Sequence, residues 1–198
     1  MDIPEELKNA IEELLLKNKN NEIIQNAQII SNKYRKNDGK GKRLLTEQNE
    51  AISYAVSRMP ATYAAVHSAV CQTLENYSED LQTLFDIGAG TGAATWAIND
   101  IIDISNIRCF EREQNMMNIG KQLMNNTELS KVQWEQFDIL QDDIKERSDI
   151  VVTSYMINEL PEKEKEIVIR KLWNATNKLL IIIEPGTPAG FDNILKIR

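Results

Sequence analysis

The sequence has few of the residues that build disulfide frameworks and metal sites. Its 198 residues include two cysteines and one histidine. Cys71 falls in a pattern typical of an apolar helix face and Cys109 in that of a buried strand, so we expect two core thiols and no disulfide framework. No metal-binding motif is present, and His67 is expected to have a structural role on a helix.

Long hydrophobic runs are also missing. No apolar stretch approaches the ~20 residues that a membrane-spanning helix needs. Residues 1–17 are acidic and amphipathic, unlike a secretory or mitochondrial targeting segment. These two features predict a cytoplasmic protein that does not cross a membrane.

Positive charge is scarcer than negative charge. The chain has 23 Lys and Arg residues against 30 Asp and Glu residues, for a net charge of −7. This balance argues against a protein that coats nucleic acid, because such binding depends on neutralising phosphates. The exception is residues 33–43, where Lys33, Arg35, Lys36, Lys40, Lys42 and Arg43 accompany a single Asp38. This basic segment is either an ordinary solvated loop or a flexible arm that contacts phosphates.

Helical periodicity dominates the first 78 residues. Apolar spacing predicts one helix from Pro4 and another over residues 23–30. After the basic segment, Thr46 is expected to cap a helix that stops at Pro60. Pro60 is also suited to the first turn of a following helix, which we expect to reach about Tyr77.

From residue 81 onward, short apolar runs alternate with helical stretches. The expected strands are 82–86, 106–110, 131–136, 149–153 and 179–183, and the expected helices are 92–102, 113–126, a short one near 140–146, and 162–176. This alternation predicts right-handed βαβ units and a parallel sheet. We therefore predict an α/β fold with a helical N-terminal region, residues 1–78, and a Rossmann-like domain, residues 79–198.

The stretch Asp86–Gly92 joins the first expected strand to the next helix and reads Asp-Ile-Gly-Ala-Gly-Thr-Gly. Such a turn presents backbone N–H groups and the positive end of a helix dipole to a ligand. Its glycines fit a dinucleotide or S-adenosylmethionine (SAM), and glycine turns also occur in scaffolds without a ligand. A carboxylate at Asp86 would repel a pyrophosphate but can pair with the cationic end of SAM, and Gly92 keeps the turn open. The loop therefore predicts SAM binding.

Two further acidic residues follow strand ends. Glu111 comes about 20 residues after the glycine loop, where a carboxylate can accept hydrogen bonds from ribose hydroxyls in either ligand class. Asp138 either contacts an adenine amino group or forms a turn. The residues predicted to bind the cofactor from the glycine loop and the strand ends are Asp86, Gly88, Ala89, Gly90, Gly92, Glu111 and Asp138.

The stretch Thr153–Leu160 follows the fourth expected strand, where methyl acceptors are usually met. It contains neither an Asn-Pro-Pro-Tyr-like motif for base nitrogens nor a cysteine that could attack a pyrimidine ring, so no catalytic residue is assigned. Ser154, Tyr155 and Asn158 can line a donor or acceptor pocket, or they can be ordinary loop residues. Glu184 is either an acceptor-side carboxylate or a hydrogen-bonded acid at a strand end.

Three stretches together resemble one family: Ser57–Ala65 (Ser-Arg-Met-Pro-Ala-Thr-Tyr-Ala-Ala), the glycine loop, and Glu184–Phe191 (Glu-Pro-Gly-Thr-Pro-Ala-Gly-Phe). Over residues 46–198 the chain resembles the methyltransferase-like proteins of the small ribosomal subunit, which include mitochondrial assembly factors and bacterial ribosomal RNA methyltransferases. The resemblance implies that Tyr63 lies near the cofactor. It also implies ribosomal RNA or the small ribosomal subunit as the partner.

The chain departs from that family after the Glu184 stretch. Family members continue into a lobe whose cysteines can hold an iron–sulfur cluster, and neither Cys71 nor Cys109 matches those ligands, so we expect no cluster here. Only 15 residues follow the expected strand 179–183. That is too few for the seven strands of a SAM methyltransferase, so we expect a sheet truncated after its fifth strand and a chain that is part of a longer protein.

These features lead to one functional hypothesis with two alternatives. The first is a SAM-dependent methyltransferase that acts on small-subunit ribosomal RNA. The second is an assembly factor that binds SAM and transfers no methyl group, in keeping with the missing acceptor motif. The third is a small-molecule methyltransferase, which the sequence isoelectric point of about 4.9 favours.

Overall fold

The computed structural model describes residues 2–18 and 47–197. The expected helix over residues 23–30, the basic segment 33–43 and Thr46 lie outside the described residues. Within the described residues, no helix is both long and apolar enough to cross a membrane.

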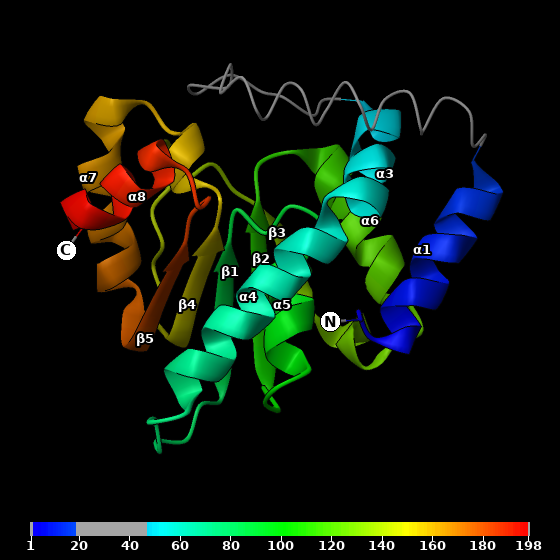
Figure 1. The fold of residues 1–198 in the computed structure, drawn as a ribbon, viewed down its shortest axis with the longest axis horizontal. Helices are drawn as coiled ribbons and strands as arrows, with labels where there is room; N and C mark the ends of the chain where they lie inside the picture. The colour runs from blue at the N-terminus through cyan, green and yellow to red at the C-terminus, as the bar shows by residue number, and fades with distance from the viewer. Residues whose placement is uncertain (1, 19–46, 198) are drawn as a thin grey trace.

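A five-stranded parallel sheet forms the centre of the molecule (Figure 1). Its strands are β1 (Thr83–Ile87), β2 (Asn106–Glu111), β3 (Gln133–Gln136), β4 (Ser148–Ser154) and β5 (Thr176–Ile183). They lie in the order β3-β2-β1-β4-β5, so the strand order reverses between β1 and β4. All five predicted strands are confirmed, with boundaries that shift by three residues or fewer.

Helices cover both faces of the sheet (Figure 1). Helices α5 (Ala93–Asn99) and α6 (Gln114–Met124) pack on one face, and α7 (Glu162–Asn174) packs on the other with α8 (Pro188–Ile197) beside it. The short turns η1 (Glu128–Lys131) and η2 (Ile157–Glu159) complete the connections. The structure is therefore the three-layered α/β fold that the sequence pattern predicts.

The short helix expected near residues 140–146 does not form. Residues 139–141 make a turn instead, in which Leu140 N donates to Asp138 Oδ1 at 3.1 Å and Asp138 N donates to Asp142 Oδ2 at 2.8 Å. Lys171 on α7 donates to the carbonyl oxygens of Ile139 and Asp142. These side-chain bonds satisfy backbone groups that a helix would otherwise pair, which is why the aspartates favour the turn.

The N-terminal helices share one hydrophobic core with the sheet. They are α1 (Glu5–Lys17), α3 (Gln48–Ser57) and α4 (Met59–Leu74). Leu7, Ile52 and Met59 are completely buried in the same cluster as Leu84 of β1. The described part of region 1–78 therefore packs as a layer of the same core, although its sequence pattern differs from that of residues 79–198.

The starts of α3 and α4 follow from their sequences. Glu47 caps α3 through a capping box, in which Glu47 N donates to the Glu50 carboxylate at 3.3 Å and Glu50 N is held by the Glu47 side chain. Pro60 lies in the first turn of α4, as predicted, where its missing N–H leaves no helical hydrogen bond unmade.

Gly120 is required by the packing of α6 on β3. A Cβ atom at this position would lie 2.6 Å from Trp134 Cζ2 and would overlap the indole ring. We expect Gly120→Val to lower the free energy of unfolding by about 2 kcal/mol or more, because overpacking displaces the ring. Urea unfolding followed by circular dichroism measures this change.

Gly186→Val is the matched control, because a Cβ atom at Gly186 meets no atom within 4 Å. We expect it to change stability by less than about 0.5 kcal/mol. Equal losses in the two variants would contradict the packing role assigned to Gly120.

Candidate functional site

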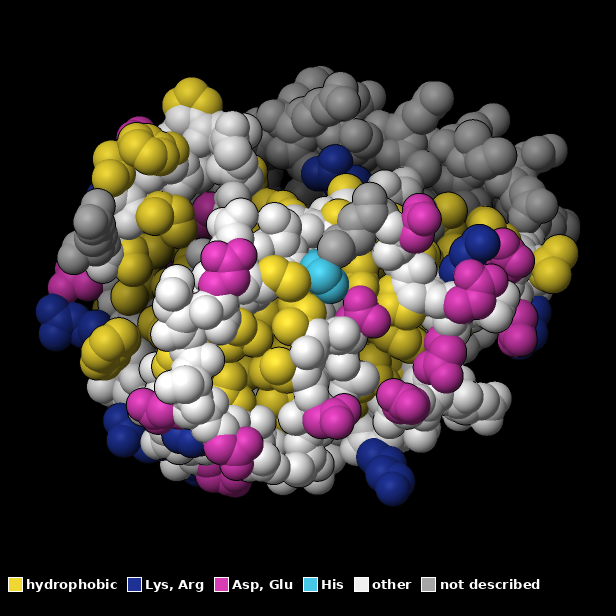
Figure 2. Space-filling view, turned by 60° about the horizontal axis from the view of Figure 1, so that its bottom comes forward, with side chains coloured by type: hydrophobic (Ala, Val, Ile, Leu, Met, Phe, Trp, Pro, Cys, Tyr) yellow, Lys and Arg dark blue, Asp and Glu magenta, His cyan; other side chains and the backbone are white. Residues whose placement is uncertain are grey.

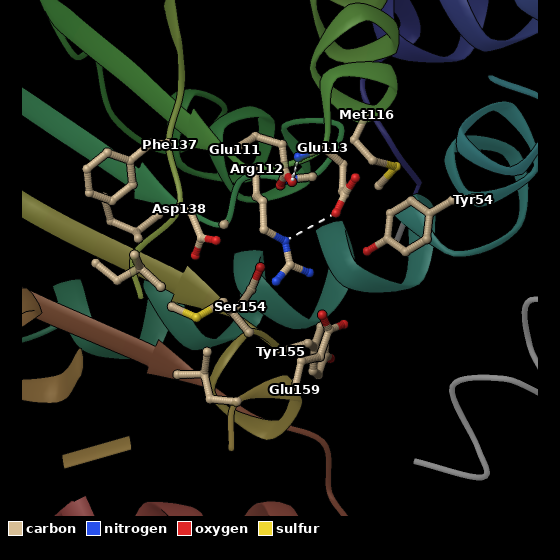
Figure 3. Close-up of a pocket in the computed structure, with 16 residues that line it drawn as sticks. Tyr54, Glu111, Arg112, Glu113, Met116, Phe137, Asp138, Ser154, Tyr155 and Glu159 are labelled. Atoms are coloured by element: carbon tan, nitrogen blue, oxygen red, sulfur yellow. Dashed lines mark hydrogen bonds and ion pairs between the residues drawn. The ribbon is translucent and has the colours of Figure 1, made fainter. Parts of the chain in front are cut away.

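A pocket opens at the carboxyl ends of β1, β2 and β4, beside the point where the strand order reverses (Figure 3). Open parallel sheets bind ligands in this crevice. The lining comes from α3, the glycine loop, the segments that follow β2 and β3, and the loop after β4. It consists of Tyr54, Ile87, Gly88, Gly90, Glu111, Arg112, Glu113, Met116, Phe137, Asp138, Ile139, Ser154, Tyr155, Met156, Glu159 and Leu160.

The glycine loop forms one wall and needs its glycines for two reasons. Gly88, Gly90 and Gly92 have φ angles of 72°, 59° and 87°, which side chains with a Cβ atom rarely adopt. In addition, a Cβ atom on Gly88 would lie 2.8 Å from Met156 Cγ across the pocket. The amides of Gly88 and Ala89 donate to Phe110 O at 2.9 and 3.0 Å, which fixes the loop against β2.

Glu111 joins the loops that follow β1 and β2. Its Oε2 accepts a hydrogen bond from Gly90 N, and its Oε1 accepts one from Glu113 N, each at 2.7 Å. The residue is 8% exposed, and burial raises the pKa of its carboxyl group. Each carboxylate oxygen has a second lone pair, so Glu111 can still accept hydrogen bonds from a ligand in the pocket.

Asp86 lies behind the pocket and faces α5. Its Oδ2 accepts hydrogen bonds from Thr95 N at 3.1 Å and Thr95 Oγ1 at 2.8 Å, which caps the first turn of α5. The carboxyl group is completely buried, and burial raises its pKa to about 7 although the bonds from Thr95 oppose the shift. Pairing of Asp86 with a cationic ligand stays a prediction; in this structure its Oδ2 supports the first turn of the helix under the glycine loop.

The predicted binding residues divide into two groups. Gly88, Gly90, Glu111 and Asp138 line the pocket, whereas Tyr63, Asp86, Ala89 and Gly92 do not. Asp138 also accepts from Leu140 N, so it forms a turn and lines the pocket, and its contact with an adenine amino group stays a prediction.

Tyr63 does not line the pocket. It is buried between α4 and α5, and its hydroxyl donates to Asp100 Oδ2 at 2.7 Å. Tyr54 of α3 supplies the tyrosine of the lining instead. Burial raises the pKa of Tyr54 to about 12, and the charge of Glu159 adds to the shift.

Arg112 and Glu113 are pocket residues that the sequence analysis did not single out. Arg112 Nε donates to Glu113 Oε1 at 3.2 Å, and Figure 3 shows Arg112 extending into the pocket toward Ser154 and Tyr155. The signal that could have revealed them is the run of three charged residues, Glu111 to Glu113, directly after a buried strand.

Glu159 is a further acidic residue in the lining that was not predicted. Burial raises the pKa of its carboxyl group to about 7. The charges of Glu111, Glu184 and Glu113 raise it further, while the charge of Arg112 lowers it. Among residues 2–18 and 47–197, the lining thus contains four acids, Glu111, Glu113, Asp138 and Glu159, and one base, Arg112. This excess of carboxyl groups favours a ligand that carries positive charge.

The loop after β4 holds Tyr155 in an uncommon conformation. Its φ angle is 62°, and its N–H donates to Ile183 O at 2.7 Å. Non-glycine residues rarely adopt such φ angles, and the surrounding structure must hold them there. They are found most often at functional sites. Ser154 and Tyr155 line the pocket, and Asn158, the third candidate in this loop, does not.

Glu184 is the hydrogen-bonded acid at a strand end rather than a residue of the pocket. Its Oε1 accepts from Asn158 N at 3.3 Å, and its Oε2 accepts from Asn193 Nδ2 at 2.9 Å. It therefore connects β5, η2 and α8. Burial raises the pKa of its carboxyl group despite these bonds.

Comparison with known proteins identifies relatives over most of the chain. The model of the family described as mitochondrial small ribosomal subunit Rsm22 matches residues 48–198. The human mitochondrial ribosome assembly protein METTL17 is 30% identical over 158 residues, which are 75% of this chain and 34% of the human protein. The chain thus spans about a third of the length of this curated relative.

Solved structures share the fold at low sequence identity. CalS10, an amino pentose methyltransferase from Micromonospora echinaspora determined with bound SAM, has a TM-score of 0.57 at 16% identity, covering 71% of this chain and 58% of its own. DhpI, in a complex with SAM, has a TM-score of 0.58 at 13% identity over 71% of this chain and 63% of its own. These matches show a Rossmann-like methyltransferase fold.

The prediction of a cytoplasmic protein is wrong, because the matched family and the human relative are both described as mitochondrial. The prediction rested on the acidic, amphipathic composition of residues 1–17. Residues 5–17 form α1, whose Leu7 and Leu14 are buried in the core. Their composition therefore reflects packing and carries no information about the compartment.

Proposed function

Because the chain belongs to the family of the mitochondrial small ribosomal subunit protein Rsm22, we propose that it binds SAM and serves in the assembly of the small ribosomal subunit. The observation that carries the SAM assignment is the acidic pocket beside the glycine loop, whose described lining has four carboxyl groups and one guanidinium group. SAM carries a sulfonium and an ammonium group against one carboxylate, so its net positive charge matches that excess. The methyltransferase fold supports the same ligand.

The pocket offers a partner for each part of SAM. Glu111 is suited to the ribose hydroxyls, because both of its oxygens retain accepting capacity. Phe137 and Asp138 are suited to the adenine ring and its amino group. Gly88 and Gly90 leave room for the methionine moiety, and the carboxylates of Glu113 and Glu159 balance its positive charge. In this proposal Asp86, Ala89, Gly92 and Tyr63 act behind the pocket by holding the loop and α5.

Glu159 makes SAM binding depend on pH. Its pKa of about 7 means that it gains negative charge between pH 6 and pH 7.5, and the ionised form attracts a cationic ligand more strongly. We expect the affinity for SAM to rise by up to about 10-fold over this range, equivalent to about 1.4 kcal/mol. Isothermal titration calorimetry at several pH values measures the change.

Glu159→Gln should bind SAM with an affinity that changes much less with pH, because the amide does not ionise. Glu166→Gln is the matched control, since Glu166 is an exposed residue of α7 away from the pocket. If Glu159→Gln and the wild type have the same pH profile, Glu159 is not the group that controls binding.

Methyl transfer to small-subunit ribosomal RNA is the second candidate function. The strained Tyr155 and the neighbouring Ser154 favour it, because they line the pocket where an acceptor would approach the methyl group. Transfer would then rely on holding donor and acceptor in line. The basic segment 33–43 is a candidate for contacts with RNA phosphates, which would make binding to RNA weaken with added salt.

SAM with a labelled methyl group, incubated with precursor and mature small subunits, separates these functions. Co-sedimentation of the protein with precursor subunits without label in the RNA supports the assembly role alone. Label in the RNA establishes methyl transfer. SAM binding with neither result would contradict both functions and direct attention to small-molecule acceptors.

A further inference from the structure

A cysteine, a histidine and an aspartate form a chain of close contacts on the α4 and α5 side of the molecule, outside the pocket. Cys71 Sγ lies 3.5 Å from His67 Nδ1, and His67 Nε2 lies 3.4 Å from Asp100 Oδ2. Cys71 and His67 are one turn apart on α4, and Asp100 caps the C-terminus of α5. The imidazole therefore stands between the thiol and the carboxylate.

Tyr63 fixes this arrangement from the core side. Its hydroxyl donates to the same Asp100 Oδ2 at 2.7 Å, and its ring centroid lies 5.7 Å from that of His67. When His67 Nε2–H donates to Asp100, Nδ1 is left with a lone pair that faces the thiol. The imidazole is thus oriented to accept the proton of Cys71.

The chain of contacts is open to solvent. The side chains of His67 and Asp100 are 13% and 45% exposed. Cys71 is partly exposed, so the prediction of a core thiol is wrong for this position. Figure 2 shows the histidine side chain, in cyan, at the surface with acidic side chains beside it. The described residues contain no group of three or more His, Cys, Asp and Glu side chains that could hold a metal ion.

Cys109 provides an internal comparison. It is completely buried in β2, and burial raises the pKa of its thiol well above the ordinary value. Thiols in such surroundings are unreactive, whereas a thiol that is accessible and paired with a base can form the reactive thiolate.

We propose that Cys71 is a reactive thiol that hydroperoxides oxidise to a sulfenic acid, with His67 as the proton acceptor and Asp100 as the residue that orients it. His67 Nδ1 takes the thiol proton, and the sulfur attacks one oxygen of the peroxide. The S–O bond forms as the O–O bond breaks, and the departing oxygen takes the proton from His67. With hydrogen peroxide the product is water, so the sulfur loses two electrons and the peroxide gains them.

The test is oxidation of the whole chain by hydrogen peroxide, followed by dimedone labelling and mass spectrometry of each cysteine. We expect Cys71 to be labelled and Cys109 not to be labelled. His67→Ala should slow the labelling of Cys71 by at least about 10-fold, since it removes the proton acceptor. Asp100→Asn should slow it by a smaller factor, because the imidazole remains but loses its orienting charge.

Gln72→Ala, next to Cys71 on the exposed side of α4, is the matched control and should leave the rate unchanged. The melting temperature of each variant shows whether α4 remains folded, and Asp100→Asn tests the proposal even if His67→Ala unfolds. Equal rates in the wild type, His67→Ala and Asp100→Asn would overturn it. Faster oxidation in His67→Ala would also overturn it, because the histidine would then only shield the thiol.

Discussion

Glu111→Ala is expected to weaken SAM binding by about 100-fold, equivalent to about 2.7 kcal/mol. The substitution removes the acceptor for Gly90 N and Glu113 N, so the loops after β1 and β2 lose the group that joins them. It also removes the acceptor proposed for the ribose hydroxyls. Isothermal titration calorimetry of the wild type and the variant measures the loss directly.

Two further variants show whether the loss comes from this position. Glu111→Gln keeps one side-chain oxygen as an acceptor, so its affinity should fall between those of Glu111→Ala and the wild type. Glu166→Ala removes an exposed charge on α7 and should bind SAM normally. Wild-type affinity in Glu111→Ala would mean that SAM binds elsewhere or that Glu111 has no part in binding it.

Asp86→Asn is expected to remove a large pH dependence from the stability of the fold. The folded-state pKa of Asp86 is about 7, against an ordinary value of 3.8, so the folded protein retains a proton that the unfolded chain releases. This contribution is fully present below about pH 4 and is lost as the pH rises through 7. At about 1.4 kcal/mol for each pKa unit, the wild type should lose up to about 4 kcal/mol from this group.

Asn at position 86 resembles the protonated acid, because its side-chain oxygen can accept from Thr95 while the group stays neutral. Urea unfolding of both proteins at pH 4, 6 and 8 measures the difference between their free energies of unfolding. We expect the variant to become more stable relative to the wild type as the pH rises from 4 to 8. Parallel profiles would show that Asp86 does not titrate near pH 7 in the folded protein.

The sheet could be predicted from the sequence because its signals are local. The apolar runs of β4 and β5 have no polar alternation, which indicates strands covered on both faces, and glycines mark the turn into α5. The prediction of a helix near residues 140–146 was wrong because the side chains of Asp138 and Asp142 accept hydrogen bonds from backbone N–H groups within the turn. Lys171 of α7 also donates to the carbonyl oxygens of Ile139 and Asp142, a contact between distant segments that sequence spacing does not show.

The pocket could be predicted only in part. Gly88, Gly90 and Glu111 follow from their places at strand ends, but the direction of Asp86 depends on tertiary packing. Asp86 pairs with Cys109 on β2 and with Val152 on β4, and its side chain then points to the face that α5 covers.

To predict the pocket residues outside the glycine motif, one would have to know how separate segments of the chain pack together. Tyr54 reaches the pocket because α3 packs against α6, whereas Tyr63 packs between α4 and α5. Burial is the main cause of the raised pKa of Glu159, and the charges of Glu111 and Glu113, more than 40 residues earlier in the chain, add to it. No local sequence pattern predicts such contacts between distant segments.

Calorimetric titration of the wild-type protein with SAM at pH 7.5 tests the central claim most directly. Binding in the acidic pocket predicts a saturable isotherm with one SAM for each chain, and strong weakening of that isotherm in Glu111→Ala. No binding by the folded wild-type protein, or an isotherm that Glu111→Ala leaves unchanged, would contradict the account.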